Sequence, residues 1–438
     1  MKTQIIYAPY ILPVTESPVL HQNHALIIED DKISAILPVE QTRHYNADIT
    51  FYLDNHVLMP GLINLHGHSA MTLLRGLADD LALMDWLNNH IWPAEGKHVS
   101  YPFVYDGTLL AMAEMIRGGT TTINDMYFFH DAVANAALKA HMRTIIGCSI
   151  LEFPTAYGQN AQSYIDLAMG TANNYRNESL VSFALAPHAP YTVADDTFRQ
   201  VIDLAQTHDL PIQCHIHETQ EEIAISEKEY GLRPLARLDK LGFLQQRLIA
   251  AHAVHVNDEE IELLAQRKVS VAHNPASNMK LASGCAPIQK MLSQKVNVGL
   301  GTDGAASNNK LDMFAEMRLA ALIAKGFSGN PTDLKAYDVI KMATINGARA
   351  LNMADRIGSL EVGKQADIIA VNLSEVETQP VFNPISHLVY SAGREQVTHS
   401  WIDGKVVLND RVLTTLDLDE LKNISCEWRQ KINLSETL

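Results

Sequence analysis

Two histidines separated by one residue, His66 and His68, follow an apolar run at residues 57–65. If that run is a buried strand, both imidazoles point to the same side, because side chains alternate along a strand. Burying two neutral imidazoles costs free energy unless their lone pairs are used, and a divalent transition metal commonly uses them. The pair therefore predicts half of a metal site, and the remaining ligands must come from elsewhere in the chain.

Eight short apolar or β-branched runs are separated by segments with helical spacing, and we interpret each run as a buried strand. The predicted strands are residues 58–65, 120–123, 144–148, 182–186, 212–216, 248–251, 269–271 and 296–300. Eight strands that alternate with helices predict an α/β fold, a (β/α)8 TIM-like barrel. In such barrels the chemistry lies at the carboxyl ends of the strands.

Each of these predicted strands ends in polar or ionisable residues or has them shortly after its end. They are His66, His68, Asn124, Asp125, Glu152, His188, His215, Glu218, His252, His273, Asn274 and Asp303. A barrel would bring them to one mouth. We interpret His217 and His255 as structural or supporting groups, and His273 as a turn-stabilising residue that lines the mouth rather than a ligand.

The ends of the chain have a different pattern. β-like runs occur at residues 25–37, and again at 366–371 and 401–408, where Asp403-Gly404 is a hairpin signal. They predict one small β-sandwich domain built from residues 1–57 and 361–438, beside a barrel domain at 58–360. Helical spacing predicts helices at 105–117, 195–208 and 258–267 in the barrel, and a surface helix at 416–434.

Composition limits the class of partner. The 438 residues are 47% hydrophobic and carry a formal net charge of −16 at pH 7, which argues against nucleic acid as a partner. No apolar run is long enough to span a bilayer, so no membrane association is expected. The four cysteines have no paired spacing, which is typical of reduced thiols in the cytoplasm.

Five segments carry a resemblance to a known family. They are His66-Gly67-His68, residues 214–218 (CHIHE), residues 251–255 (AHAVH), residues 301–304 (GTDG) and residues 358–367 (GSLEVGKQAD). Their order resembles the amidohydrolase superfamily across nearly the whole chain. Residues 74–80 and 86–95 are similar to the branch that contains methylthioadenosine and S-adenosylhomocysteine deaminases, related to triazine and guanine aminohydrolases.

The resemblance implies one metal ion per chain, held by residues matching His66, His68, His215 and Asp303. Zinc is the expected ion, and iron or manganese could replace it, because imidazole and carboxylate ligands do not choose sharply among them. A homo-oligomer, either a dimer or a tetramer, is also expected.

Hydrolytic deamination of an amino-heterocycle explains why these residue types are needed. Zinc lowers the pKa of its bound water to about 7 and so provides the nucleophile. Glu218 is the predicted acid that protonates the ring nitrogen and then the leaving ammonia. His252 is expected to orient the water, and Asp303 to act as both ligand and base.

The substrate is expected to be an aminopurine nucleoside. Glu95 matches the family position that accepts hydrogen bonds from both ribose hydroxyls, and His188 matches one that contacts the nucleoside. Family members that bind S-adenosylhomocysteine well use arginines after the third strand, but residues 149–175 contain none. We therefore expect methylthioadenosine to be preferred, unless Arg75 or another subunit binds the carboxylate.

Two other metal-dependent chemistries need residues that this sequence lacks. A two-metal amidohydrolase needs a carboxylated lysine on the fourth strand. Here that strand ends Leu185-Ala186-Pro187-His188, without a lysine, so one metal is expected. The unrelated zinc deaminases need a Cys-x-x-Cys, which the sequence lacks. An aminohydrolase of guanine, a triazine or a pterin stays open. So does a non-catalytic metal-binding protein, although structural metal sites are usually closed and rich in cysteine.

Overall fold

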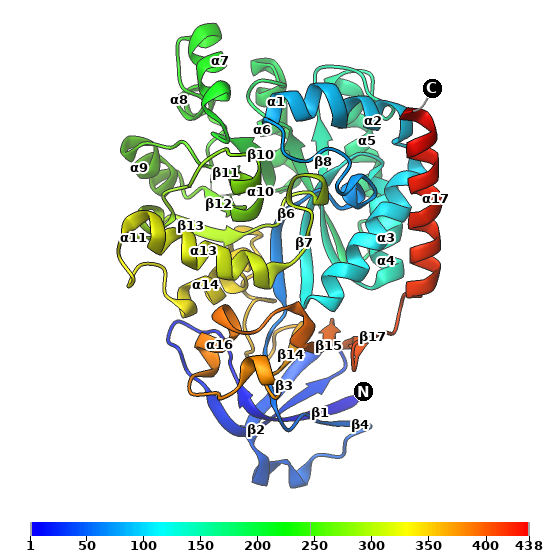
Figure 1. Ribbon diagram of the computed structural model, residues 1–438, viewed down its shortest axis with the longest axis vertical. Helices are drawn as coiled ribbons and strands as arrows, with labels where there is room; N and C mark the ends of the chain where they lie inside the picture. The colour runs from blue at the N-terminus through cyan, green and yellow to red at the C-terminus, as the bar shows by residue number, and fades with distance from the viewer. Residues whose placement is uncertain (1, 246, 437–438) are drawn as a thin grey trace.

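The structure is a computed structural model that describes residues 2–245 and 247–436 (Figure 1). It contains a sheet of eight parallel strands, ordered along the chain and curved into a nearly closed barrel, and a second sheet of nine strands. In Figure 1 the second sheet lies below the barrel. The predicted fold class, a (β/α)8 barrel with a β domain from both chain ends, is confirmed.

The barrel strands each overlap one of the eight predicted runs. They are β6 (Leu62–Gly67), β7 (Thr120–Tyr127), β8 (Arg143–Ile150), β9 (Val181–Pro187), β10 (Ile212–Ile216), β11 (Leu248–His252), β12 (Ser270–His273) and β13 (Asn297–Leu300). The first and last strands meet where the Asp303 amide donates a 2.9 Å hydrogen bond to the His66 carbonyl. This contact helps to close the barrel at the carboxyl ends of its strands.

The first predicted run divides into two strands that belong to different sheets. β5 (His56–Pro60) pairs with the second sheet, and β6 begins the barrel after Gly61. A Cβ atom at Gly61 would lie 2.1 Å from Thr121 Oγ1, so a side chain there would collide with β7. The chain passes from one sheet to the other at a position where only glycine fits.

Helices surround the barrel strands. They are α3 (Tyr101–Arg117), α4 (His130–Ala140), α5 (Ala161–Asn174), α6 (Asp195–His208), α7 (Gln220–Tyr230), α8 (Pro234–Lys240), α9 (Asp258–Arg267), α10 (Pro275–Lys280), α11 (Ile288–Ser293), α12 (Ala305–Asn308), α13 (Met313–Ser328), α14 (Ala336–Met342) and α15 (Ile345–Ala350). α6 and α9 have the predicted bounds. α1 (Leu83–Trp86), the π-helical turn η3 (Leu87–Ile91) and α2 (Trp92–His98) lie at the upper end of the barrel in Figure 1.

The second sheet joins the two ends of the chain. Its order is β17-β16-β15-β14-β5-β1-β2-β3, with β4 also paired to β1. The strands are β1 (Thr3–Ile11), β2 (His21–Glu29), β3 (Lys32–Pro38), β4 (Ile49–Tyr52), β14 (Ile368–Asn372), β15 (Val397–Ile402), β16 (Lys405–Asn409) and β17 (Val412–Leu413). β5 is the central link, parallel to β1 and antiparallel to β14. The predicted domain boundaries at residues 57/58 and 360/361 stay a prediction.

Three contacts connect the later part of the chain with the barrel. Arg143, at the start of β8, is 1% exposed and donates to Asp367 Oδ2 at 2.8 Å and to Asp403 Oδ1 at 3.0 Å. The terminal helix α17 (Leu418–Glu436) packs along α3, where Trp428 Nε1 donates to Asp106 Oδ2 at 2.8 Å (Figure 1). Helix α16 (Pro384–Tyr390) contacts α14, one of the helices that surround the barrel.

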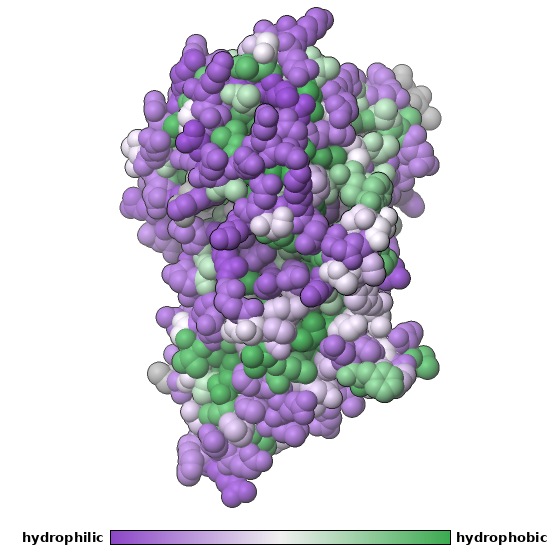
Figure 2. Space-filling model, turned by 90° about the vertical axis from the view of Figure 1, so that its left-hand side faces the viewer, coloured by the Kyte–Doolittle hydropathy of each residue, from purple (hydrophilic) through white to green (hydrophobic). Residues whose placement is uncertain are grey.

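The surface in Figure 2 is mostly hydrophilic at the level of the barrel, and apolar side chains gather lower on this face, toward the second sheet. Among the described residues, no helix combines the length and the apolar character that a membrane span requires.

Candidate functional site

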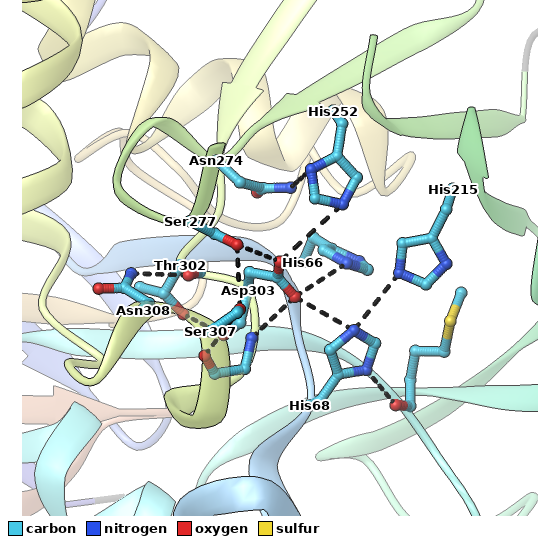
Figure 3. Close-up of polar contacts among 12 residues, drawn as sticks. His66, His68, His215, His252, Asn274, Ser277, Thr302, Asp303, Ser307 and Asn308 are labelled. Carbon is cyan, nitrogen blue, oxygen red and sulfur yellow. Dashed lines mark hydrogen bonds and ion pairs between the residues drawn. The ribbon is translucent and has the colours of Figure 1, made fainter. Parts of the chain in front are cut away.

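Four predicted ligands converge at the carboxyl end of the barrel (Figure 3). His68 Nε2 lies 3.2 Å from Asp303 Oδ1 and 3.4 Å from His215 Nε2, and His66 Nε2 lies 3.6 Å from the same Asp303 oxygen. Ligand atoms around a tetrahedral zinc ion lie about 3.3 Å apart, given bond lengths near 2.0 Å. These three distances therefore match the spacing that one small divalent ion requires.

The other ring nitrogens of two of these histidines are already used. Nδ1 of His68 is 2.7 Å from the Met126 carbonyl, and Nδ1 of His215 is 2.7 Å from the His188 carbonyl. Because a carbonyl can only accept, each Nδ1 carries a hydrogen. The neutral form of each imidazole, the form that binds a metal, therefore has its lone pair at Nε2, which faces the centre of the cluster. Such backbone contacts are typical of metal-binding histidines.

His66 gives independent support for a metal. It is fully buried, and within the described residues neither of its ring nitrogens has a hydrogen-bond partner. Burial lowers the pKa of His66 to about 3, so the imidazole is neutral near pH 7. A buried neutral imidazole without a partner is costly, and a metal at the centre of the cluster would use its free lone pair. The residues present therefore fit a divalent metal ion.

Asp303 is held in one orientation by its neighbours. Its Oδ2 accepts a 2.7 Å hydrogen bond from Ser277 Oγ, and its Oδ1 accepts one of 2.8 Å from the Gly304 amide. Burial opposes its ionisation, but the contact with His68 holds the pKa of Asp303 well below its usual range. Its φ of +62° is a left-handed conformation, which is uncommon for residues other than glycine, although aspartate adopts it more readily than most.

Glu218 and His252 lie beside the cluster. His252 Nε2 is 3.7 Å from Glu218 Oε2 and 3.9 Å from Asp303 Oδ2, and its Nδ1 is 2.8 Å from Asn278 Oδ1. Burial raises the pKa of Glu218, which moves this carboxyl toward the range in which it can carry a proton near neutral pH. The pair can therefore transfer protons next to the metal position.

A cavity of about 350 Å³ opens onto this cluster. Its ionisable lining includes His68, Glu95, His188, His215, Glu218, His252 and Asp303. His188 Nδ1 lies 3.0 Å from Thr192 Oγ1, and burial lowers the pKa of His188 to about 4, so it is a neutral hydrogen-bonding group. All predicted site residues thus lie at one place, with His66 beneath the cavity and the others on its wall.

The sequence analysis did not assign three further histidines as metal ligands. His217 Nε2 accepts a 3.1 Å hydrogen bond from the Leu235 amide, and His255 Nε2 is 2.6 Å from the Ser283 carbonyl, as expected for structural groups. The prediction that His273 lines the mouth is wrong. This residue is buried and lies within β12, paired in register with Leu300, rather than in the turn that follows.

Several supporting residues were missed by the sequence reasoning. Ser277 and Asn278, which bind Asp303 and His252, follow the predicted strand end and carry only a weak polar signal. Glu222 accepts hydrogen bonds from the amides of His217 at 2.8 Å and Glu218 at 2.9 Å. The Thr219-x-x-Glu222 pattern, typical of a capping box, could have drawn attention to Glu222.

Comparisons with known proteins agree with this geometry. Residues 57–407 match the model of the Amidohydrolase family. The chain is 44% identical over 431 residues to 5-methylthioadenosine/S-adenosylhomocysteine deaminase of Saccharophagus degradans, which covers 98% of this chain and 96% of that protein. It is 43% identical to 5′-deoxyadenosine deaminase of Methanocaldococcus jannaschii, with 90% and 93% covered.

A solved structure is similar throughout. The crystal structure of an adenosine deaminase from Xanthomonas campestris with bound zinc has a TM-score of 0.97 and 46% sequence identity, with 98% of each chain covered. The family match spans most of the chain and includes every predicted site residue. The chain belongs to the amidohydrolase family.

Proposed function

We propose that this protein is a metal-dependent hydrolytic deaminase of adenosine-type nucleosides. Its proposed substrates are 5′-methylthioadenosine and S-adenosylhomocysteine, which it converts to the inosyl product and ammonia. The observation that carries the proposal is the convergence of His66, His68, His215 and Asp303 beside the buried carboxyl of Glu218. The names of the relatives at 43–46% identity support the same reaction and the same substrate class.

The contacts support a separate role for each residue of the site. His66, His68, His215 and Asp303 would hold one zinc ion, with iron or manganese as replacements. Zinc would supply a water of pKa about 7 as the nucleophile. His252 would orient that water, and Asp303 would accept its proton.

Glu218 would protonate the purine ring nitrogen next to the carbon that is attacked. It would then recover a proton from the hydroxyl group of the tetrahedral adduct and pass it to the leaving amine, which departs as ammonia. The proton held by Asp303 would restore the acid form of Glu218 for the next turnover. Its buried position suits this role, because burial raises the pKa of Glu218 and favours its protonated form before the reaction. Glu95 would accept hydrogen bonds from ribose, and His188 would contact the nucleoside.

The cavity supports a preference among nucleosides. Its apolar lining comes from the barrel mouth and from the segment that contains α1 and α2, and consists in part of Trp86, Leu87, Ile91, Trp92, Phe128, Leu151 and Phe153. Within the described residues, no lysine or arginine lines it. Arg75 instead pairs with Glu114 at 2.5 Å, so it is not a free partner for an amino-acid carboxylate.

A substrate panel tests the proposal. We expect a higher kcat/KM for methylthioadenosine than for S-adenosylhomocysteine, because the thioether tail is apolar and the amino-acid carboxylate lacks a cation. The panel contains both nucleosides, adenosine, adenine, guanine and a chlorotriazine, followed by absorbance and ammonia release. A preference for a free base or for the triazine would contradict the nucleoside proposal, and no turnover by the metal-loaded protein would favour a binding role. The homo-oligomer and the cytoplasmic location stay predictions.

A further inference from the structure

One hydrogen bond connects a barrel strand to the segment at the cavity mouth. Tyr127 is the last residue of β7, and its hydroxyl donates a 2.6 Å hydrogen bond to Oε1 of Glu95 on α2. Tyr127 is 4% exposed, Glu95 is half-buried, and both line the cavity. Within residues 2–245 and 247–436, this hydroxyl is the only hydrogen-bond partner of the Glu95 carboxylate.

The direction of this hydrogen bond is defined by the two groups. Burial raises the pKa of the Tyr127 hydroxyl well above its usual value, so the hydroxyl keeps its proton and donates. Burial also raises the pKa of Glu95, and the hydrogen bond from Tyr127 acts against that shift. An ionised carboxylate has about four acceptor positions on its two oxygens. Tyr127 uses one of them and leaves both oxygens able to accept from a ligand.

We propose that Tyr127 is a positioning residue that determines specificity for vicinal diols, by fixing the orientation of the Glu95 carboxylate. The inference rests on the proposed function, in which Glu95 accepts hydrogen bonds from the two ribose hydroxyls. The terminal torsion of a glutamate side chain is broad. A carboxylate fixed before the substrate arrives avoids part of the entropy cost of binding.

The proposal predicts an effect on binding rather than on the chemical step. The ribose hydroxyls are remote from the purine carbon that is attacked, so their contact with Glu95 contributes equally to the ground state and the transition state. Loss of the Tyr127 hydroxyl should therefore raise KM with kcat nearly unchanged. The effect should occur only with substrates that carry both hydroxyls.

The experiment compares adenosine with 2′,3′-dideoxyadenosine in the metal-loaded enzyme. In Tyr127→Phe, the ratio of the two kcat/KM values should fall by about tenfold, the usual scale for one hydrogen bond to a charged group. The kcat for adenosine should stay within about twofold of wild type. Tyr175→Phe is the matched control, because it removes a hydroxyl that binds Asn135 at 3.1 Å, away from the cavity. Its ratio should equal that of wild type.

Glu95→Ala in the same assay distinguishes a failure of the proposed diol-binding role of Glu95 from a failure of the positioning role of Tyr127. If Glu95→Ala leaves the ratio unchanged, Glu95 does not bind the diol, and both the proposed role and this inference are wrong. If Glu95→Ala lowers the ratio and Tyr127→Phe does not, only the positioning inference is wrong. Metal content and thermal unfolding of Tyr127→Phe show that it is folded, and Tyr127→Leu, which also lacks the hydroxyl, repeats the comparison should the first variant fold poorly.

Discussion

Glu218 illustrates how the site depends on single side chains. The residue is 7% exposed. One carboxyl oxygen is 3.7 Å from His252 Nε2, and the other accepts a 3.4 Å hydrogen bond from Ser283 Oγ. In that position burial raises the pKa of Glu218, whereas the nearby Asp303 stays ionised through its contact with His68. The pKa values of two carboxyl groups in one cavity are thus shifted in opposite directions, as the proposed roles of Glu218 as acid and Asp303 as base require.

Replacing Glu218 by Gln should separate binding from chemistry. Gln keeps the size of the side chain but cannot transfer a proton, so kcat should fall by about a hundredfold or more. The affinity for the inosyl product, measured by competitive inhibition, should change little. A nearly normal kcat would mean that another group is the acid.

Removing one predicted ligand should remove the metal. In His66→Ala the bound metal, measured by elemental analysis after dialysis, should fall well below the one ion per chain expected of wild type, and activity should fall with it. His217→Ala is the control, because His217 is hydrogen-bonded to the Leu235 amide outside the cavity. Full metal content and activity in His66→Ala would exclude it as a ligand.

At the scale of elements, the turn between β10 and α7 (Gln220–Tyr230) carries Glu218 to the site. His217 has a φ of +57°, and the amides of His217 and Glu218 both donate to the carboxylate of Glu222, the third residue of α7. The Thr219 hydroxyl accepts from the Glu222 amide at 3.3 Å and caps the helix. The start of the helix therefore holds the backbone on which the proposed acid is placed.

Glu222→Ala should weaken catalysis without removing the metal. It would leave two buried amides unpaired, at a cost of about 1–3 kcal/mol each, and would free the turn to move. We expect kcat to fall by about tenfold to a hundredfold, since misplacing a reacting group by about 1 Å can have that effect. Glu221→Ala, which truncates the exposed neighbour, should behave as wild type. An unchanged kcat in a folded Glu222→Ala enzyme would contradict this role.

The strands could be predicted because buried parallel strands are continuous apolar runs, and the proposed ligands because they lie at or shortly after the ends of such runs. The strand predicted at 120–123 was nevertheless too short, because β7 continues through Asn124 and Asp125 to Tyr127. These polar residues are buried. Asn124 Nδ2 donates to the Leu65 carbonyl at 2.9 Å and to Gln213 Oε1 at 3.0 Å, partners that local sequence cannot show.

Local sequence also could not show the contacts made by the supporting residues of the site. Ser277 and Asn278 reach Asp303 and His252 only because α10 packs against the end of the barrel, and the contact between Tyr127 and Glu95 joins residues on two separate elements. Periodicity predicts which face of an element is buried, but not which side chain it meets there. Residues that act through another side chain were therefore the ones that sequence did not find.

At the scale of the whole molecule, a buried ion cluster connects the barrel with the second sheet. The guanidinium of Arg143 lies between Asp367 and Asp403, and both carboxylates raise the pKa of Arg143 although burial opposes ionisation. Asp403 is in the hairpin between β15 and β16, and Asp367 directly precedes β14. The cluster thus holds the later strands of the second sheet against the base of the barrel.

Arg143→Met should destabilise the fold strongly. It would leave Asp367 buried without its cation, and breaking a buried ion pair in this way costs about 3–5 kcal/mol. The midpoint of urea unfolding, followed by tryptophan fluorescence, should fall accordingly. Arg199→Met removes an exposed pair with Asp196 and should change stability by less than about 1 kcal/mol. Equal stability of the two variants would show that the cluster does not hold the sheets together.

The pairing of β5 with β14 also has a consequence for the time course of synthesis. Leu58 is opposite Ala370 in the finished sheet, so more than three hundred residues leave the ribosome between the two partners. At about 5–20 residues per second, β5 waits roughly 15–60 s for this neighbour. During that interval one edge of an apolar strand is without its partner, and such edges attract other chains. We therefore expect the nascent chain to be most prone to association with other chains while the barrel is still being made.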